Sequence, residues 1–168
     1  MLPGTVSIDL RAATASDEPF LFALYVSTRE HELAGWGWAP AQRDAFLRMQ
    51  WLAQSHDWAA RYPGADHQVV CLHGQPAGRL LVARAPSEWR VVDIALLPQH
   101  HGGGVGTRLL THVRDAAEKA GVPLRLRVLR NNPARRLYER LGFEADAASD
   151  QDAADPYVSL SWRPAPRP

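Results

Sequence analysis

Four glycines within five residues make the segment from Leu97 to Leu110 the most restrictive part of this sequence. Gly102, Gly103, Gly104 and Gly106 lie between a strand-like run, 90–97, and a helix-like run, 105–120. Glycines allow the backbone to turn tightly and to approach a ligand closely. A helix that begins here presents unpaired N–H groups and a partial positive charge, which suit a phosphate. The segment predicts a site for a phosphorylated small molecule, and the alternative is a turn that only connects strand to helix.

Length and composition favour one globular domain. The chain has 168 residues, of which 46% are hydrophobic and 22% are charged, which is ordinary for a folded domain with a core of its own. We expect a single domain over 1–163 and a disordered tail over 164–168. The net charge of +1 favours neither nucleic acid nor membrane as a partner. Neither a secretion signal nor a long apolar run is evident, so the expected location is cytoplasmic.

Two sequence features that carry reactive side chains are interpreted as structural. Cys71 is the single cysteine and lies in an apolar run, so we expect a small buried side chain rather than a nucleophile. The adjacent His100 and His101 have no partner at metal-ligand spacing, and no metal is expected.

Hydrophobic periodicity and turn residues predict the order β-α-α-β-β-β-α-β-α-β-β. The expected strands are 7–13, 67–72, 78–84, 90–97, 124–129, 143–145 and 157–162, and the expected helices are 16–31, 41–55 (an extension to 61 also fits), 105–120 and 133–141. The segment 147–156 is expected to be a loop. The fold class is α/β of the α+β type, with a mixed, mainly antiparallel sheet flanked by helices. The strands 90–97 and 124–129, joined by a helix, should be parallel.

Two finer predictions concern the first helices. Ser16 is a candidate N-cap for the first helix. The second helix has apolar residues at helical spacing, which predict its buried face: Ala45, Phe46, Met49, Leu52 and Ala53.

The glycine segment matches neither of two common phosphate-binding patterns. A P-loop needs a lysine followed by Ser or Thr after its last glycine, whereas Thr107 and Arg108 follow Gly106. A dinucleotide-binding fold needs its glycines after the first strand and an acidic residue about 20 residues later. Here the glycines come late, and the next strand carries arginines.

A second motif, over 131–143, changes the interpretation, because the two motifs together resemble the GNAT superfamily of acetyl-CoA-dependent N-acetyltransferases. The family's first signature, Pro-x-x-Arg/Gln-x-x-Gly-x-Gly/Ala, is matched by Pro98, His101, Gly104 and Gly106. The second, Asn-x-x-Ala-x-x-Leu-Tyr-x-x-x-Gly-Phe, is matched by Asn131, Ala134, Leu137, Tyr138, Gly142 and Phe143. The element order also agrees with the family.

The resemblance implies transfer of an acetyl group from acetyl-CoA to a primary amine, directly within a ternary complex. The acceptor would be a small molecule or a peptide, and homodimers are common in the family. Two alternatives stay open: a non-catalytic CoA-binding sensor or structural module, and a transferase of another acyl group. A local basic patch, formed by arginines near 125–140, would suit the 3′-phosphate of CoA.

By the same resemblance, three segments would hold the cofactor: backbone at 94–97, the glycine loop with the start of its helix, and the second motif. The residues are Ile94, Leu96, Leu97, His101, Gly102, Gly103, Gly104, Val105, Gly106, Thr107, Asn131, Ala134 and Tyr138. A main-chain N–H near Leu96 would polarise the thioester carbonyl. Asn131 would contact the cofactor arm or cap the helix near Pro133.

His101 departs from the family pattern, which has Arg or Gln at this position. A neutral histidine supplies at most one N–H donor, and its charge depends on pH. We therefore expect CoA affinity that is weaker or more dependent on pH, with backbone amides carrying most of the binding.

The catalytic candidates are Tyr138 and Asp93. Tyr138 matches the family tyrosine that protonates the CoA sulfur, and a phenol can donate a proton at neutral pH; the alternative is a core tyrosine. Asp93 interrupts an apolar strand and is the candidate base; the alternative is an ion-paired strand residue. Acceptor candidates are Glu32, Trp36, Trp38 and Gln50, whose alternative roles are packing and solvation.

Overall fold

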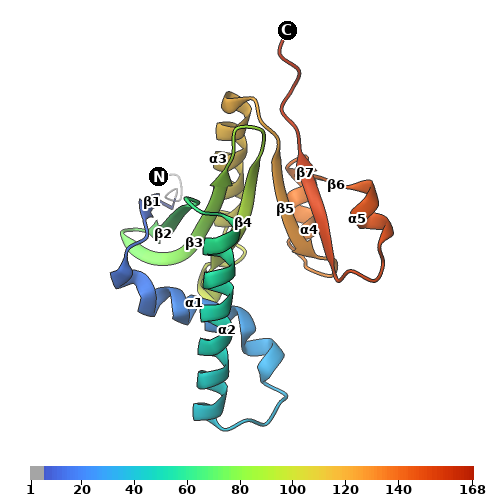
Figure 1. Ribbon diagram of the computed structural model, residues 1–168. Helices are drawn as coiled ribbons and strands as arrows, with labels where there is room; N and C mark the ends of the chain where they lie inside the picture. The colour runs from blue at the N-terminus through green and yellow to red at the C-terminus, as the bar shows by residue number, and fades with distance from the viewer. Residues whose placement is uncertain (1–5) are drawn as a thin grey trace. The chain divides into compact units, whose positions relative to one another are not determined.

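The computed structural model describes residues 6–168 as strands flanked by helices (Figure 1). The elements in chain order are β1 (Ile8–Ala12), η1 (Ala15–Asp17), α1 (Glu18–Leu33), α2 (Pro40–Arg61), β2 (Asp66–Leu72), β3 (Gln75–Arg84), β4 (Trp89–Leu96), η2 (Pro98–His100), α3 (Val105–Ala120), β5 (Leu124–Leu129), α4 (Arg135–Arg140), β6 (Glu144–Ala145), α5 (Ala147–Gln151) and β7 (Tyr157–Trp162). Backbone contacts divide the chain into two compact units. The first runs to Leu81 and includes 93–103, and the second comprises 82–92 and 104–168.

The strands form one mixed sheet in the order β1-β2-β3-β4-β5-β7-β6. β1 pairs with β2, and β7 with both β5 and β6, in antiparallel fashion. β4 and β5 are parallel, with Trp89 opposite Leu124 and Val91 opposite Leu126. The predicted fold class and the predicted parallel step across α3 are both confirmed.

The second unit has the most regular hydrophobic pattern. The buried face of α3 consists of Val105, Leu109, Leu110, Val113 and Ala117. On β5, buried Leu124, Leu126 and Val128 alternate with more exposed residues, as the sequence predicts. Each fully buried Leu or Val contributes about 1.5–3 kcal/mol, so these stripes stabilise the unit strongly.

The predicted buried face of α2 is wrong except for Phe46, which is partly buried and packs against the cluster formed with α1. Met49 and Leu52 are 61% and 54% exposed, and the buried residues of α2 are Leu47 and Trp51. Leu47 and Trp51 are four residues apart and therefore lie on one helix face. They join the cluster formed by α1, in which the Trp51 ring lies 5.4 Å from that of Phe22.

The connection between β2 and β3 is tighter than predicted. His73 and Gly74 have φ angles of +50° and +78°, the combination found in two-residue hairpin turns. β3 therefore begins at Gln75 instead of residue 78. The predicted start of this strand at residue 78 was wrong, because a histidine in the left-handed conformation is uncommon and a tight turn at His73 was not expected.

The predicted loop over 147–156 contains the short helix α5. Its support comes from a distant residue: the guanidinium of Arg130 donates hydrogen bonds to the carbonyls of Ser149, Asp152 and Asp155. Because these bonds link residues about 20 positions apart, local sequence gives no sign of them.

The start of α1 depends on Asp17 rather than on Ser16. Asp17 is 6% exposed and accepts hydrogen bonds of 2.7 and 2.8 Å from Arg11, and one of 2.8 Å from the Thr14 amide. The Arg11 guanidinium, and next the Thr14 amide, hold the pKa of Asp17 well below its ordinary value. A depressed pKa stabilises the fold above the ordinary pKa of 3.8, and this stabilisation is lost as the pH falls toward the lower folded pKa.

We expect Asp17→Asn to lower the free energy of unfolding at pH 7, because Arg11 loses its charged partner, and to have a smaller effect near pH 3. Denaturant unfolding at the two pH values measures the difference. Asp9→Asn, at an exposed position on β1, is the control and should change little at either pH. Equal losses for Asp17→Asn at both pH values would contradict the assignment.

Candidate functional site

The end of β4 contains the first group of candidate residues, and Asp93 is held there by Arg79. Asp93 Oδ2 accepts hydrogen bonds from Arg79 Nε at 2.8 Å and from Arg79 Nη2 at 2.5 Å. The Arg79 side chain is 7% exposed and that of Asp93 is 25% exposed. The Arg79 guanidinium also lies 4.9 Å from the centre of the Trp58 ring. Asp93 is thus both an ion-paired residue of the strand and a carboxylate whose Oδ1 takes no part in these two bonds.

Arg79 is a residue that the sequence reasoning missed. It is a lone charged side chain in an otherwise apolar strand, Ala77–Val82, and this pattern was the available signal. A buried charge needs a partner, so an arginine here calls for a carboxylate on a neighbouring strand.

Backbone groups after Asp93 are partly engaged. The N–H of Leu97 donates to the Ala77 carbonyl at 2.8 Å, and the Leu97 carbonyl accepts from the His100 N–H at 2.9 Å. Leu97 therefore has little left to offer a ligand from its backbone. Ile94 and Leu96 are half-buried on the same strand.

His101 is folded back toward β4. Its Nε2 lies 2.8 Å from the Leu96 carbonyl oxygen, and since a carbonyl only accepts, Nε2 carries the proton. In the neutral ring Nδ1 is then an acceptor without a proton. In this conformation only the charged form of His101 offers a donor to a phosphate.

The start of α3 has the geometry that a phosphate site requires. Gly104 precedes the helix with φ +80°, and a Cβ at this position would meet no atom within 4 Å. A left-handed residue is costly for any side chain except glycine. The amides of Val105, Gly106 and Thr107 belong to the first turn, where N–H groups lack intrahelical acceptors.

The second motif surrounds α4. Tyr138 is 8% exposed, and its ring lies 6.1 Å from that of Phe143. Ala134 precedes the helix. The side chain that caps this turn belongs to Asn132, whose Oδ1 accepts from the Ala134 N–H at 2.9 Å. Asn131 is exposed and does not make this cap.

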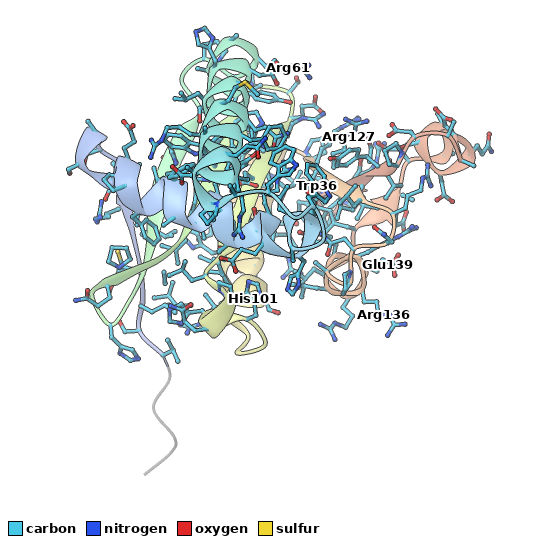
Figure 2. All side chains as sticks on the ribbon, turned by 90° about the horizontal axis from the view of Figure 1, so that it is seen from below. Trp36, Arg61, His101, Arg127, Arg136 and Glu139 are labelled. Atoms are coloured by element: carbon cyan, nitrogen blue, oxygen red, sulfur yellow. The ribbon has the colours of Figure 1, made fainter. Side chains whose placement is uncertain are left out.

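The acceptor candidates lie on the first two helices and their connection. Trp36, labelled in Figure 2, is 50% exposed and lies 5.1 Å from Trp38, which in turn lies 4.9 Å from Phe46. Glu32 is exposed and pairs with Arg29 at 3.3 Å. Gln50 is half-buried on α2. The two tryptophans thus form an aromatic cluster with an exposed member.

Three arginines of the basic patch predicted near 125–140 have acidic or carbonyl partners. Arg125 lies 2.5 Å from a Glu88 oxygen, Arg127 pairs with Asp155 at 2.8 Å, and Arg130 holds α5 as described above. These partners are distant in sequence, so the prediction of a local basic patch near 125–140 did not include them.

The remaining observations concern the cysteine, potential metal ligands and helix hydropathy within the described residues. Cys71 is buried, as predicted. Residues 6–168 contain no cluster of three or more potential metal ligands. Within the same range, every helix is too short or too polar to cross a membrane.

The fold is that of known acetyltransferases. The PaiA N-acetyltransferase of Thermoplasma acidophilum, solved with coenzyme A, superimposes with a TM-score of 0.67 at 17% identity, covering 94% of this chain and 99% of that one. The ribosomal-protein-S18-alanine N-acetyltransferase of Escherichia coli superimposes with a TM-score of 0.62 at 21% identity, covering 96% of this chain and 97% of that one. An acetyltransferase of Thermus thermophilus superimposes with a TM-score of 0.62 at 22% identity, covering 94% of this chain and 97% of that one.

The sequence also matches the Acetyltransferase (GNAT) family over residues 21–143. The chain therefore belongs to this family, and the resemblance noted from the two motifs is confirmed. It is an N-acetyltransferase that depends on acyl-CoA.

We expect Gly104→Val to reduce CoA binding at least about tenfold, since a β-branched residue resists the left-handed conformation that begins α3. Isothermal calorimetry with CoA measures the change. Gly64→Val is the matched control, because Gly64 also has a positive φ (+76°) with no atom near its Cβ position. Equal CoA affinity in Gly104→Val and the wild type would show that the start of α3 does not hold the cofactor.

Proposed function

We propose that this protein transfers the acetyl group of acetyl-CoA directly to a primary amine within a ternary complex. The observation that supports this most is the left-handed Gly104 at the start of α3, within the family's motif. Amides at 102–107 would bind the pyrophosphate, and Asn131, Ala134 and the backbone at 94–96 would contact the rest of the cofactor. A main-chain N–H near Leu96 would polarise the thioester carbonyl.

The reaction needs a neutral amine and a stabilised leaving group. As the amine nitrogen forms its bond to the carbonyl carbon, the carbon–sulfur bond breaks and the sulfur leaves with the electron pair. Tyr138 would give the phenolic proton to that sulfur. Asp93 would accept a proton from the amine, directly or through water, or hold the ammonium before transfer. The ion pair with Arg79 supports a fixed position for this carboxylate.

His101 would contribute to phosphate binding only when charged, since its Nε2 proton is bonded to Leu96. Backbone amides do not titrate in the accessible pH range. Binding of the cofactor would therefore rest mainly on the loop and the start of α3, and His101 would add a donor only in its charged form.

The acceptor would lie near the aromatic cluster of Trp36 and Trp38, with Glu32 and Gln50 as polar contacts. An exposed indole can hold a cationic or apolar amine. The name of the E. coli enzyme gives an alanine of ribosomal protein S18 as its acceptor, so a peptide amine and a small amine are both suitable acceptors to test.

The direct experiment follows acetyl-CoA consumption across a panel of polyamines, amino acids, aminoglycosides and N-terminal peptides, with CoA binding measured in parallel. Transfer to one amine class supports the proposal. CoA binding without transfer to any class would favour a sensor or structural module, and a preference for succinyl-CoA or propionyl-CoA would favour another acyl group.

We expect Tyr138→Phe to lower kcat by about 100-fold or more while acetyl-CoA affinity changes little, because only the proton donor is removed. Steady-state kinetics and calorimetry separate the two effects. Tyr157→Phe, on an exposed tyrosine of β7, is the control. An unchanged kcat would remove Tyr138 from the role of general acid.

We expect Asp93→Asn to lower kcat/KM by about 100-fold, because an amide cannot take up the amine proton. A purely structural role would lower stability and leave kcat/KM of the folded variant close to that of the wild type. Denaturant unfolding of the variant is measured alongside, because the substitution also deprives Arg79 of its charged partner.

A further inference from the structure

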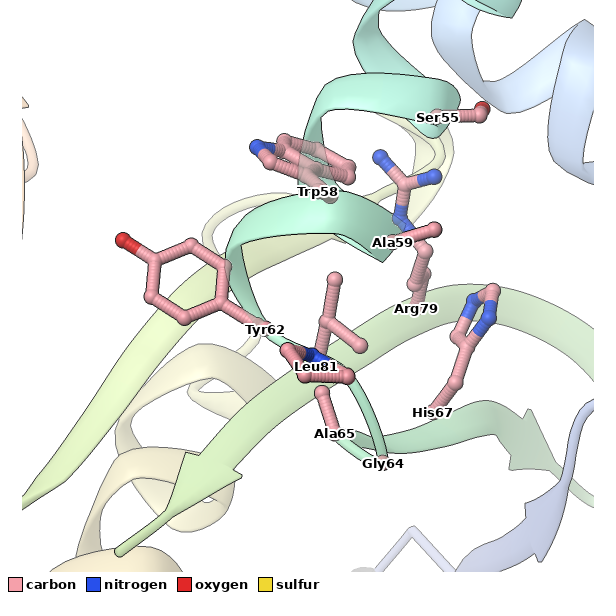
Figure 3. Close-up of a pocket in the computed structure, with 10 residues that line it drawn as sticks. Ser55, Trp58, Ala59, Tyr62, Gly64, Ala65, His67, Arg79 and Leu81 are labelled. Atoms are coloured by element: carbon pink, nitrogen blue, oxygen red, sulfur yellow. The ribbon is translucent and has the colours of Figure 1, made fainter.

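A cavity of about 260 Å³ lies in the first unit, beside the end of α2 and the strands β2 and β3 (Figure 3). Its lining includes Trp58, Ala59, Tyr62, His67, Arg79 and Leu81. Small-molecule sites usually measure about 300–1,000 Å³, so a cavity slightly below this range suits only a small ligand. The catalytic proposal makes no use of this cavity.

One end of the cavity is polar because of Arg79. A guanidinium has five N–H donors, and the bonds to Asp93 use only Nε and one N–H of Nη2. The other N–H groups have no acceptor within residues 6–168, although the side chain is 7% exposed. Arg79 lines the cavity, and guanidinium donors favour a partner that brings oxygen acceptors.

His67 adds to the polar end without adding charge. Its Nε2 is buried and has no hydrogen-bond partner in the part of the chain described. Burial lowers the pKa of His67, and the charge of Arg79 lowers it further, so the ring is neutral near pH 7. Figure 3 shows the Arg79 guanidinium beside Trp58, with the His67 ring on the side away from Tyr62.

The rest of the lining is largely apolar. Leu81 is 7% exposed, and Tyr62, Ala65 and Pro63 line the same cavity. Such surfaces accept a hydrocarbon body and gain about 25 cal/mol for each Å² removed from water. The cavity thus combines a guanidinium with unused donors at one end and an apolar wall at the other.

We propose that this cavity binds a small aromatic or aliphatic monocarboxylate, with the carboxylate on Arg79 and the apolar body against Tyr62 and Leu81. A guanidinium is suited to carboxylates because its donors match their two oxygens. A neutral amide of the same shape would leave the charge of Arg79 without a second partner.

Such a ligand would act on Asp93 through the residue they share. A second carboxylate on Arg79 competes with Asp93 for the guanidinium and weakens the existing ion pair. If Asp93 serves in the proposed transfer, occupancy of the cavity changes the rate. This consequence rests on the proposed function, whereas binding of the carboxylate does not.

Benzoate and benzamide are the matched probes, titrated into the full chain without acetyl-CoA. Calorimetry should give one benzoate site, with benzamide at least about tenfold weaker, or 1.4 kcal/mol. The NMR signal of the Arg79 Nε–H, assigned with Arg79→Lys, should shift with benzoate. Absence of benzoate binding, or equal binding of benzamide, would overturn the proposal.

A pair of neighbouring alanines on α2 locates the site. Ala59 and Ala60 are both exposed, but Ala59 lines the cavity and Ala60 does not. Ala59→Leu should abolish benzoate binding by filling the cavity without touching the Arg79–Asp93 pair, and Ala60→Leu should leave it unchanged. Equal benzoate affinity in the two variants would exclude this cavity. Acetyl transfer is measured in a separate assay. If no acetyl transfer is found, the proposed function fails, but the benzoate titration still tests the cavity.

Discussion

The ion pair between Arg79 and Asp93 is the constraint on which the centre of the first unit depends. Both side chains come from strands, and Arg79 is buried. Removal of one partner from a buried pair costs about 3–5 kcal/mol, because the other charge stays in a medium that solvates it poorly. The pair therefore fixes side-chain positions on β3 and β4 together. It also places a carboxylate at a defined point on the strand that leads into the glycine loop.

The pair has two sides with different chemistry. Asp93 uses one oxygen for both bonds to Arg79, and Arg79 uses two of its donors. What is left over is an acceptor oxygen on Asp93 and several N–H groups on Arg79 that line the cavity beside Trp58. A residue proposed for catalysis and a cavity proposed for ligand binding thus share one guanidinium, so a change of charge on one side alters the balance on the other.

Much of the fold could be predicted from the sequence, because the strongest patterns are local. The α3 stripe, the alternation of β5 and the parallel step between β4 and β5 need only periodicity and the rules of chain connection. The errors occurred where distant residues decide. Arg130 supports α5 from 19 or more residues away, and Leu47 and Trp51, rather than Met49 and Leu52, face the α1 cluster. For the candidate site, motif spacing predicts roles for the glycine loop and Tyr138, and these stay predictions. Arg79 was missed because its role appears only when β3 and β4 are paired.

The structure defines how a histidine at position 101 differs from the arginine or glutamine that the family motif has there. From the sequence, a histidine in place of arginine is a weaker donor whose charge varies with pH. The hydrogen bond from Nε2 to the Leu96 carbonyl limits the donor further. It fixes the proton on Nε2 and leaves Nδ1 without one in the neutral ring. The His101 side chain then has two separate roles. It fastens the turn after β4 at every protonation state, and it offers a phosphate a donor only when it gains a second proton. An arginine here would carry a charge at any accessible pH, whereas the neutral histidine spends its one N–H on the Leu96 carbonyl.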